Sequence, residues 1–344
     1  MRLAVPVILS IWAGCGGDSS LMAANPGNEP GAADGASSTS DMGVSGTINY
    51  ADLAWTDLAS SSTDMASPVT PTSLPPGTTV TSIWGTGADN IYLATNAKAV
   101  YHVGSDGVPH AQSVPNGLVG ITGSDAQHIW AISAATVLFS SGDGTWTMQH
   151  APNDPEFLYV TGIWASGPND VYATGIRKGG FGAIYHSTGD GNWSAQQATG
   201  TRMYGVWGRS KSDVYAVGWT NQVFHTTGDG TWTDLSAQFS GSFTTVWGNA
   251  TDVFIAGASI YRSHAGGAWT VDGSGGTTAW DIRGGWASAS DNVWAVGTGG
   301  LLLHRDANGW SVVASNTKSD LYALWSTDAS HVWIGGVDVF GQLH

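Results

Sequence analysis

The sequence is poor in basic residues, in cysteine and in helical patterning. Its 344 residues include 11 Lys+Arg against 26 Asp+Glu, which gives a formal net charge of −15. Nucleic-acid binding is not expected, because affinity for phosphates depends on lysine and arginine and no basic stripe is present. The single cysteine, Cys15, excludes an internal disulfide. No stretch keeps a 3.6-residue apolar period, so the sequence predicts almost no helix.

Residues 1–14 have the form of an export signal. Arg2 precedes an apolar run, Leu3–Ala13, that is too short to span a bilayer and has signal-peptide character. Cys15 follows in the string WAGC, which resembles a bacterial lipobox, where small residues precede a cysteine that is lipidated after cleavage. The resemblance implies a lipoprotein attached to the membrane through Cys15, and Gly16 after the cysteine favours the outer membrane. Trp12 departs from the usual lipobox leucine, and the alternative is an ordinary secretory signal.

Residues 15–76 are predicted to form a disordered spacer between this anchor and the folded domain. After Cys15 they are rich in Ser, Thr, Ala, Gly and Pro and contain no Lys or Arg. Such a composition buries too little apolar surface to fold alone. A spacer of this kind holds a domain away from the membrane.

Residues 77–344 contain a motif that recurs seven times. The copies IWASGPNDVYATG, VWGRSKSDVYAVG and GWASASDNVWAVG show it best, and equivalent anchor residues lie 38 to 43 residues apart. The anchors are Trp84, Thr122, Trp164, Trp207, Trp247, Trp286 and Trp325. A repeat of about 40 residues with four short strands is typical of a propeller blade. The sequence therefore predicts an all-β, seven-bladed β-propeller.

The turn between the third and fourth strands carries a second motif. The strings SSGDGTW, STGDGNW and TTGDGTW resemble a shortened Asp-box, the hairpin turn of sialidase-type and photosystem-assembly-type propellers. The resemblance implies that their aspartates stabilise the hairpins and that their tryptophans pack between blades. These residues are Asp143, Asp190 and Asp229, and Trp146, Trp193 and Trp232. The first and fifth blades depart from the motif.

The last repeat stops at His344 without an outer strand. The spacer contains Trp55–Leu58, whose sequence repeats Trp232–Leu235 on a predicted outer strand. Two interpretations stay open at this point. The segment is either plain spacer, or an N-terminal strand that completes the last blade and removes an exposed edge.

Catalytic and metal-binding patterns are missing from the repeats. The chain has only two glutamates, Glu29 and Glu156, and lacks the motifs of serine hydrolases, zinc proteases and phosphate-binding loops. Histidines recur at one third-strand position, but equivalent positions on different blades lie far apart, whereas metal ligands must converge. We interpret them as structural hydrogen-bonding groups: His102, His186, His225, His304 and His344. We therefore predict no catalytic residue, no metal and no cofactor.

Candidate binding residues lie on one face of the predicted ring. Loops from the second to the third strand share this face with the connections between blades, and they hold several basic residues and two tryptophans outside the repeat register. The turns on the opposite face hold mainly aspartates. Loops on a rigid scaffold are the usual place for binding, and a face of this kind suits an anionic partner. The predicted ligand-binding residues are Lys98, Arg177, Lys178, Arg202, Trp219, Trp280 and Arg283.

These features favour a non-enzymatic, monomeric module of the bacterial envelope, tethered through Cys15 and presenting its loop face to a protein or a glycan. One alternative is an Asp-box-type glycoside hydrolase acting on surface polysaccharide, which would have to use aspartates as its paired carboxylates. Another is an assembly-assisting structural propeller without a small-molecule ligand.

Overall fold

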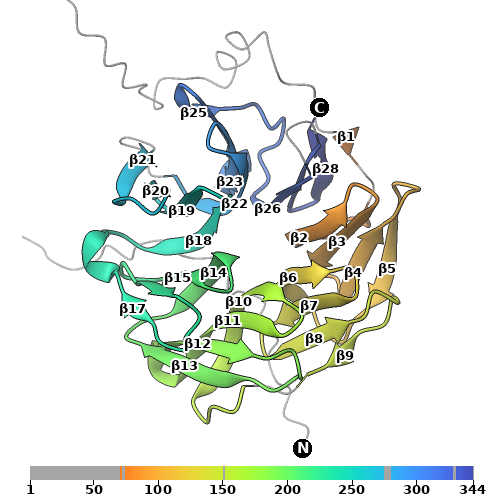
Figure 1. Cartoon of the computed structure of the whole chain (residues 1–344). Coiled ribbons are helices and arrows are strands. Elements are labelled where there is room, and N and C mark those ends of the chain that lie inside the picture. The colour runs from red at the N-terminus through yellow and green to blue at the C-terminus, as the bar shows by residue number, and fades with distance from the viewer. Residues whose placement is uncertain (1–69, 72–73, 150–151, 275–279, 328–330, 344) are drawn as a thin grey trace, which may run out of the picture. The chain divides into compact units, whose positions relative to one another are not determined.

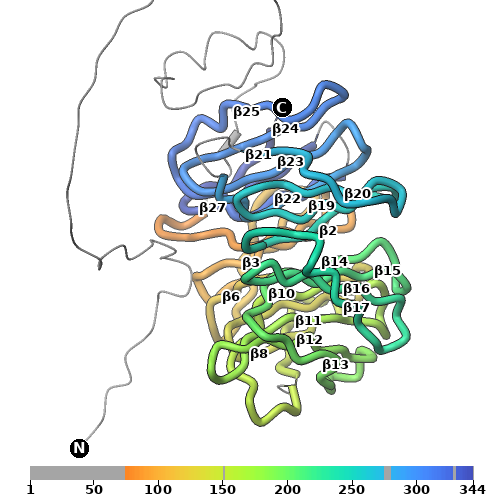
Figure 2. The backbone as a smooth tube through the Cα atoms, turned by 90° about the vertical axis from the view of Figure 1, so that its left-hand side faces the viewer, coloured from red at the N-terminus to blue at the C-terminus, as the bar shows by residue number. Residues whose placement is uncertain are grey.

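A computed structural model describes residues 70–71, 74–149, 152–274, 280–327 and 331–343, which form seven four-stranded antiparallel sheets arranged around a ring (Figure 1). The predicted seven-bladed, all-β propeller is confirmed. The side view shows the sheets as successive layers (Figure 2). Cys15, the export signal and Trp55–Leu58 lie outside the described residues.

The first strand of each blade lies nearest the ring axis and the fourth lies at the rim (Figure 1). Blade 1 is β2 (Val80–Gly87), β3 (Asn90–Thr95), β4 (Ala99–Val103) and β5 (Pro109–Ser113). Blade 2 is β6 (Leu118–Asp125), β7 (His128–Ser133), β8 (Thr136–Ser140) and β9 (Thr147–Met148). Blade 3 is β10 (Phe157–Gly167), β11 (Asp170–Arg177), β12 (Gly182–Ser187) and β13 (Ser194–Thr199). Blade 4 is β14 (Met203–Ser210), β15 (Asp213–Gly218), β16 (Val223–Thr226) and β17 (Thr233–Asp234).

The remaining blades follow in sequence order, except for one strand. Blade 5 is β18 (Phe243–Gly248), β19 (Asp252–Gly257), β20 (Ser259–His264) and β21 (Thr270–Ser274). Blade 6 is β22 (Ile282–Ala289), β23 (Asn292–Gly297), β24 (Leu302–Asp306) and β25 (Gly309–Val312). Blade 7 is β26 (Leu321–Ser326), β27 (Val332–Gly336), β28 (Val339–Leu343) and β1 (Thr70–Pro71). The described residues also contain three short 3-10 helices, η3 (Lys178–Gly180), η4 (Ser236–Gln238) and η5 (Thr298–Gly300), and no helix among them is long and apolar enough to cross a bilayer.

The ring is closed by the N-terminal strand β1. Thr70 pairs with Gln342 and Pro71 with Gly341, so β1 supplies the outer strand that the C-terminal repeat lacks. An N-terminal strand therefore completes the last blade, but Thr70–Pro71 forms it, in the position beside β28 for which Trp55–Leu58 was considered. These two residues precede residue 77, the predicted start of the propeller.

First-strand tryptophans pack each blade onto the next. A Cβ atom at Gly123 would lie 2.4 Å from the ring of Trp84, which belongs to the preceding blade. The same contact joins the last blade to the first, since a Cβ atom at Gly85 would lie 3.0 Å from Trp325. A glycine is required at these places because the flat ring occupies the space of a side chain. These first-strand tryptophans are thus structural.

The tryptophans of the third-to-fourth turns also join neighbouring blades. The indole N–H of Trp146 donates to Gln112 of blade 1 at 2.8 Å, and that of Trp232 donates to Gln196 of blade 3 at 3.0 Å. Trp193 donates to Gln149 in the same way at 3.3 Å. Packing between blades is therefore confirmed for these tryptophans, and the glutamine partners are a feature that the sequence analysis missed.

The recurring histidines bond within their own blades. His102 bonds Asn90 at 2.7 Å and His186 bonds Asp170 at 2.8 Å, in each case linking the third strand to the residue that begins the second. The structural interpretation of the histidines is confirmed for His102, His186, His225 and His304. In blade 7 the register gives this position to Gln342, which pairs with Trp333, so assigning it to His344 was wrong. Only Val337 and Asp338 separate β27 from β28, so the equivalent position falls two residues before His344.

Candidate functional site

Three connections of blades 3 and 4 meet on the face that carries the loops between blades. They are the β11–β12 loop with η3, the β13–β14 connection, and the β15–β16 turn. The Arg202 guanidinium carbon lies 5.6 Å from the centroid of the Trp219 ring, in a cation–π arrangement. A Cβ atom at Gly180 would lie 4.0 Å from Arg202 Nε, which places η3 beside this pair. We call Lys178, Phe181, Arg202 and Trp219 the blade 3–4 platform.

The platform exposes large apolar side chains. Trp219 is 42% exposed and Phe181 is 52% exposed, and Leu158 at the start of β10 is 36% exposed on the same face. Only six large apolar side chains are this exposed in the described part of the chain, so half of them belong to this face of two neighbouring blades. Scattered exposed apolar residues need no explanation, but a cluster beside cations is typical of an interaction surface.

The backbone of the platform is held in place. Trp219 N donates to Arg202 O at 2.9 Å, and Thr201 Oγ1 donates to Trp219 O at 2.6 Å. Thr220 and Asn221 both have φ of 53°, in the left-handed region. A β-branched residue rarely adopts this conformation, and such strain persists where the surroundings enforce it. Trp219 is therefore presented by a fixed turn rather than by a mobile loop tip.

Arg177 has a structural role in the same loops. Its Nε donates to Asp154 Oδ2 at 2.8 Å, and a second bond of 3.2 Å runs from its NH2 group to Oδ1. The Asp154 side chain is 5% exposed and also accepts a hydrogen bond from Tyr185. Burial raises the pKa of Tyr185, and its hydrogen bond to the Asp154 carboxylate raises it further. The charge of Arg177 is thus neutralised by a nearly buried carboxylate, and the pair fixes the loop before blade 3 against β11.

The other predicted residues are distributed around the ring. Lys178 Nζ donates to Pro155 O at 2.8 Å. Arg283 donates to Asp281 at 2.6 Å, and Trp280 is half-buried against the core of blades 5 and 6. Lys98 is exposed on the β3–β4 turn of blade 1. Of the predicted set, the structure brings Arg202 and Trp219 into contact and places beside Arg202 the short helix η3, which begins at Lys178 and is followed by Phe181.

The opposite face, which we call the hairpin face, carries the turns between third and fourth strands, and the aspartates of these turns are ionised. Hydrogen bonds from the Thr145 side chain and backbone hold the pKa of Asp143 below its usual range, and the Thr231 hydrogen bonds do the same for Asp229. In the described residues no group of three His, Cys, Asp or Glu side chains is placed to hold a metal ion. These aspartates give the hairpin turns of blades 2 and 4 a negative charge.

No family model and no curated protein matches the chain. Among solved structures, YCF48 from Cyanidioschyzon merolae is 17% identical with a TM-score of 0.64, covering 81% of this chain and 99% of that one. A structure of YCF48 bound to D1 peptide is 15% identical with a TM-score of 0.63, covering 81% and 99%. Virginiamycin B lyase from Staphylococcus aureus is 17% identical with a TM-score of 0.65, covering 78% and 96%. At these identities the likeness shows the propeller fold, which serves an enzyme and a peptide-binding protein alike.

Proposed function

We propose that the chain is a non-enzymatic interaction module that captures a protein partner on the blade 3–4 platform. The observation that carries the proposal is the exposed Arg202–Trp219 pair, held on a strained turn beside Phe181. Tryptophan and arginine are the residue types that most often dominate protein interfaces, and rigid presentation lowers the entropy lost on binding. The peptide complex of a fold neighbour supports a protein partner for a ring of this shape.

The partner segment should combine an apolar side chain with a carboxylate. Phe181 and Trp219 offer apolar surface, while Lys178 and Arg202 supply positive charge. The hairpin face, with its ionised aspartates, would repel the same segment. A glycan partner for the platform is the other outcome of the test below.

The platform is tested by pull-down from solubilised envelope, with quantitative mass spectrometry as readout. We expect Trp219→Ala and Arg202→Ala each to weaken capture of the main partner by about tenfold to a hundredfold, as for interface anchors worth roughly 1.4 to 3 kcal/mol. Met148→Ala is the control for Trp219→Ala, because it removes an exposed apolar side chain from another blade. Lys211→Ala is the control for Arg202→Ala, because it removes an exposed cation outside the platform. Capture that is equally strong in the platform variants and in the controls would exclude this surface.

We also propose that the module is an envelope lipoprotein anchored through Cys15, with residues 16–69 as its tether. The support is the lipobox-like string and the lack of any other cysteine. Cys15→Ala should move the chain from the membrane fraction to the soluble fraction, because it removes the acyl chains that the proposal assigns as the anchor. Membrane association that survives the substitution would contradict lipid anchoring, and Ser19→Ala serves as the nearby control.

A further inference from the structure

A polar pocket lies at the rim of blade 3, away from the platform. Its volume is about 650 Å³, within the range of pockets that hold small ligands. One wall is Pro152 and Asn153, from the connection between blades 2 and 3. The rest comes from the β12–β13 hairpin, with His186 at the end of β12, the turn residues Asp190 and Asn192, and Ser194.

Two hydrogen bonds fix the wall against the hairpin. Asn153 N donates to Trp193 O at 3.3 Å, and the Trp193 indole donates to Gln149. The connection is held on its far side by the bonds between Asp154 and Arg177. The pocket is therefore formed in advance of any ligand.

Blade 3 departs here from the symmetry of the ring. Blades 2 and 4 carry the same turn, with Asp143 and Asp229 in place of Asp190, and with Thr145 and Thr231 in place of Asn192. The turn itself is thus structural, since each aspartate accepts a hydrogen bond from the backbone two residues on. Relative to blades 2 and 4, blade 3 adds the amide of Asn192, which Asn308 matches in blade 6, and it adds the wall with Asn153.

The lining offers hydrogen-bonding groups of both kinds. Among the described residues the Asn153 side chain makes no hydrogen bond, and Asn192 uses its Nδ2 on Asp190 Oδ2 at 3.1 Å while its Oδ1 has no partner. His186 Nε2 bonds Asp170 Oδ1 at 2.8 Å. Asp190 stays ionised, because the backbone and side-chain bonds from Asn192 lower its pKa. No lysine or arginine lines the pocket, and Trp193 is only 3% exposed.

From this lining we propose that the blade 3 pocket binds a neutral saccharide unit. Sugar hydroxyls donate to a carboxylate and accept from amides, which is the combination that Asp190, Asn153 and Asn192 present. A uronate or phosphate would be repelled by Asp190 with no cation to offset it. An aliphatic or aromatic ligand would leave these hydrogen-bonding groups without partners. The proposal is independent of the platform and goes beyond the protein-binding function.

The test uses the full chain and a panel of neutral mono- and disaccharide methyl glycosides, read by saturation-transfer NMR at up to about 10 mM ligand. We expect at least one member to bind, and the double variant Asn153→Ala, Asn192→Thr to bind it at least tenfold more weakly. Threonine occupies the position of Asn192 in two sister turns, so this variant should keep its fold, which an unchanged thermal midpoint will verify. The uronic-acid analogue of the bound sugar should bind at least tenfold more weakly than the neutral form.

Matched controls separate the pocket from the rest of the ring. Thr145→Ala changes the equivalent turn residue of blade 2, and Trp219→Ala removes the platform; both should leave saccharide binding unchanged. Failure of every neutral glycoside to bind, or binding that the double variant does not weaken, overturns the proposal. Stronger binding of the uronate overturns it as well. A loss of saccharide binding with intact partner capture would leave the platform function standing.

Discussion

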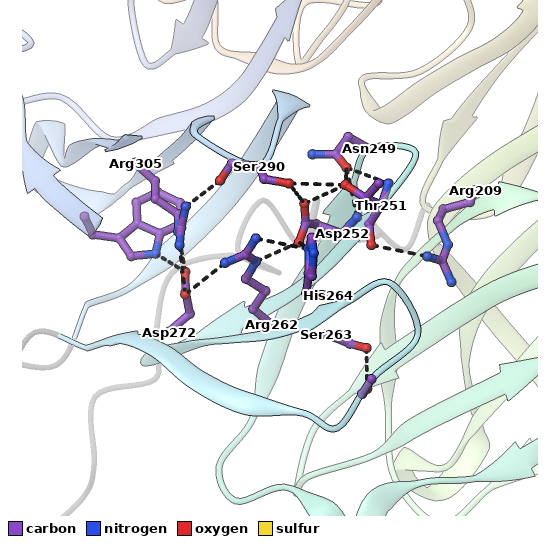
Figure 3. Close-up of polar contacts among 12 residues, drawn as sticks. Arg209, Asn249, Thr251, Asp252, Arg262, Ser263, His264, Asp272, Ser290 and Arg305 are labelled. Carbon is purple, nitrogen blue, oxygen red and sulfur yellow. Dashed lines mark hydrogen bonds and ion pairs between the residues drawn. The ribbon is translucent and has the colours of Figure 1, made fainter. Parts of the chain in front are cut away.

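Replacing Asp252 with alanine is expected to lower the free energy of unfolding by about 3–5 kcal/mol, the usual effect of removing one partner from a buried ion pair. Asp252 is fully buried, with 0% exposure. Its Oδ1 accepts hydrogen bonds from Arg262 Nε at 2.7 Å and from His264 Nδ1 at 2.8 Å, and its Oδ2 accepts from Ser290 and Thr251 (Figure 3). Alanine would leave the Arg262 guanidinium without its closest negative charge.

The effect should be large because Asp252 joins two blades. Ser290 belongs to blade 6, and Arg262 continues the network to Asp272 at 3.9 Å. Asp272 in turn accepts from Arg305 Nε at 2.9 Å and from the Trp310 indole at 2.7 Å, both in blade 6 (Figure 3). Blade 5 thus has an arginine where blades 1, 3, 4 and 6 have a histidine, and this arginine reaches two carboxylates, Asp252 and Asp272.

Urea unfolding followed by tryptophan fluorescence measures this change. The matched control is Asp281→Ala, which removes a 45% exposed carboxylate paired with Arg283 and should change stability by no more than about 1 kcal/mol. The double variant Asp252→Ala, Arg262→Ala should recover part of the loss, because it removes the unpaired charge as well. Equal midpoints for Asp252→Ala and Asp281→Ala would show that the network does not hold blades 5 and 6 together.

Acid titration gives a second readout of the same carboxylate. Burial by itself raises the pKa of Asp252, but hydrogen bonds from Arg262, Ser290 and His264 together hold it well below its usual range. A depressed pKa in the folded state contributes stability above the unfolded value of about 3.9 and loses it as pH falls through the folded value. Asp213, whose pKa is lowered to about 2, contributes in the same window. The stability of Asp252→Ala should therefore fall less steeply below pH 4 than that of the parent chain.

The repeat made the fold predictable, because the anchor tryptophans recur at the period of a blade. Contacts between residues that are far apart in the sequence were much harder to predict. Arg177 looked like a free cation, since its partner Asp154 lies 23 residues earlier and only the fold brings the two together. Phe181 gave a weak signal as an apolar residue between glycines in an irregular loop. Asn153 gave none, because its position beside the β12–β13 hairpin depends on the path of a connection that no periodicity describes.

The closure of the ring was likewise predictable only in part, because the local pattern showed that a strand was missing but not which distant segment replaces it. An outer strand was visibly missing after β28, but its replacement could not be identified by similarity to other outer strands. Thr70–Pro71 is two residues long and is positioned by the contacts that follow it. Gly77 N donates to Asp338 Oδ1 at 2.5 Å, Asp338 N donates to Thr78 O at 3.0 Å, and Thr79 pairs with Val337.

Removing this N-terminal latch is expected to destabilise the whole propeller. A chain of residues 80–344 loses these bonds, the β1–β28 pairing and the packing of Leu74 on the core of blades 1 and 7, whereas a chain of residues 60–344 keeps them. At about 1 kcal/mol for each hydrogen bond, the shorter chain should be less stable by roughly 3–5 kcal/mol. The exposed edge of β28 should also make the shorter chain associate at high concentration, because an unpaired strand edge is a template for further pairing.

Urea midpoints measure the loss of stability and sedimentation velocity measures the association, with the full chain as the reference for residues 60–344. Identical midpoints for the two truncated chains would mean that packing of the first-strand tryptophans, with Trp325 seated on Gly85, is sufficient to keep the ring closed.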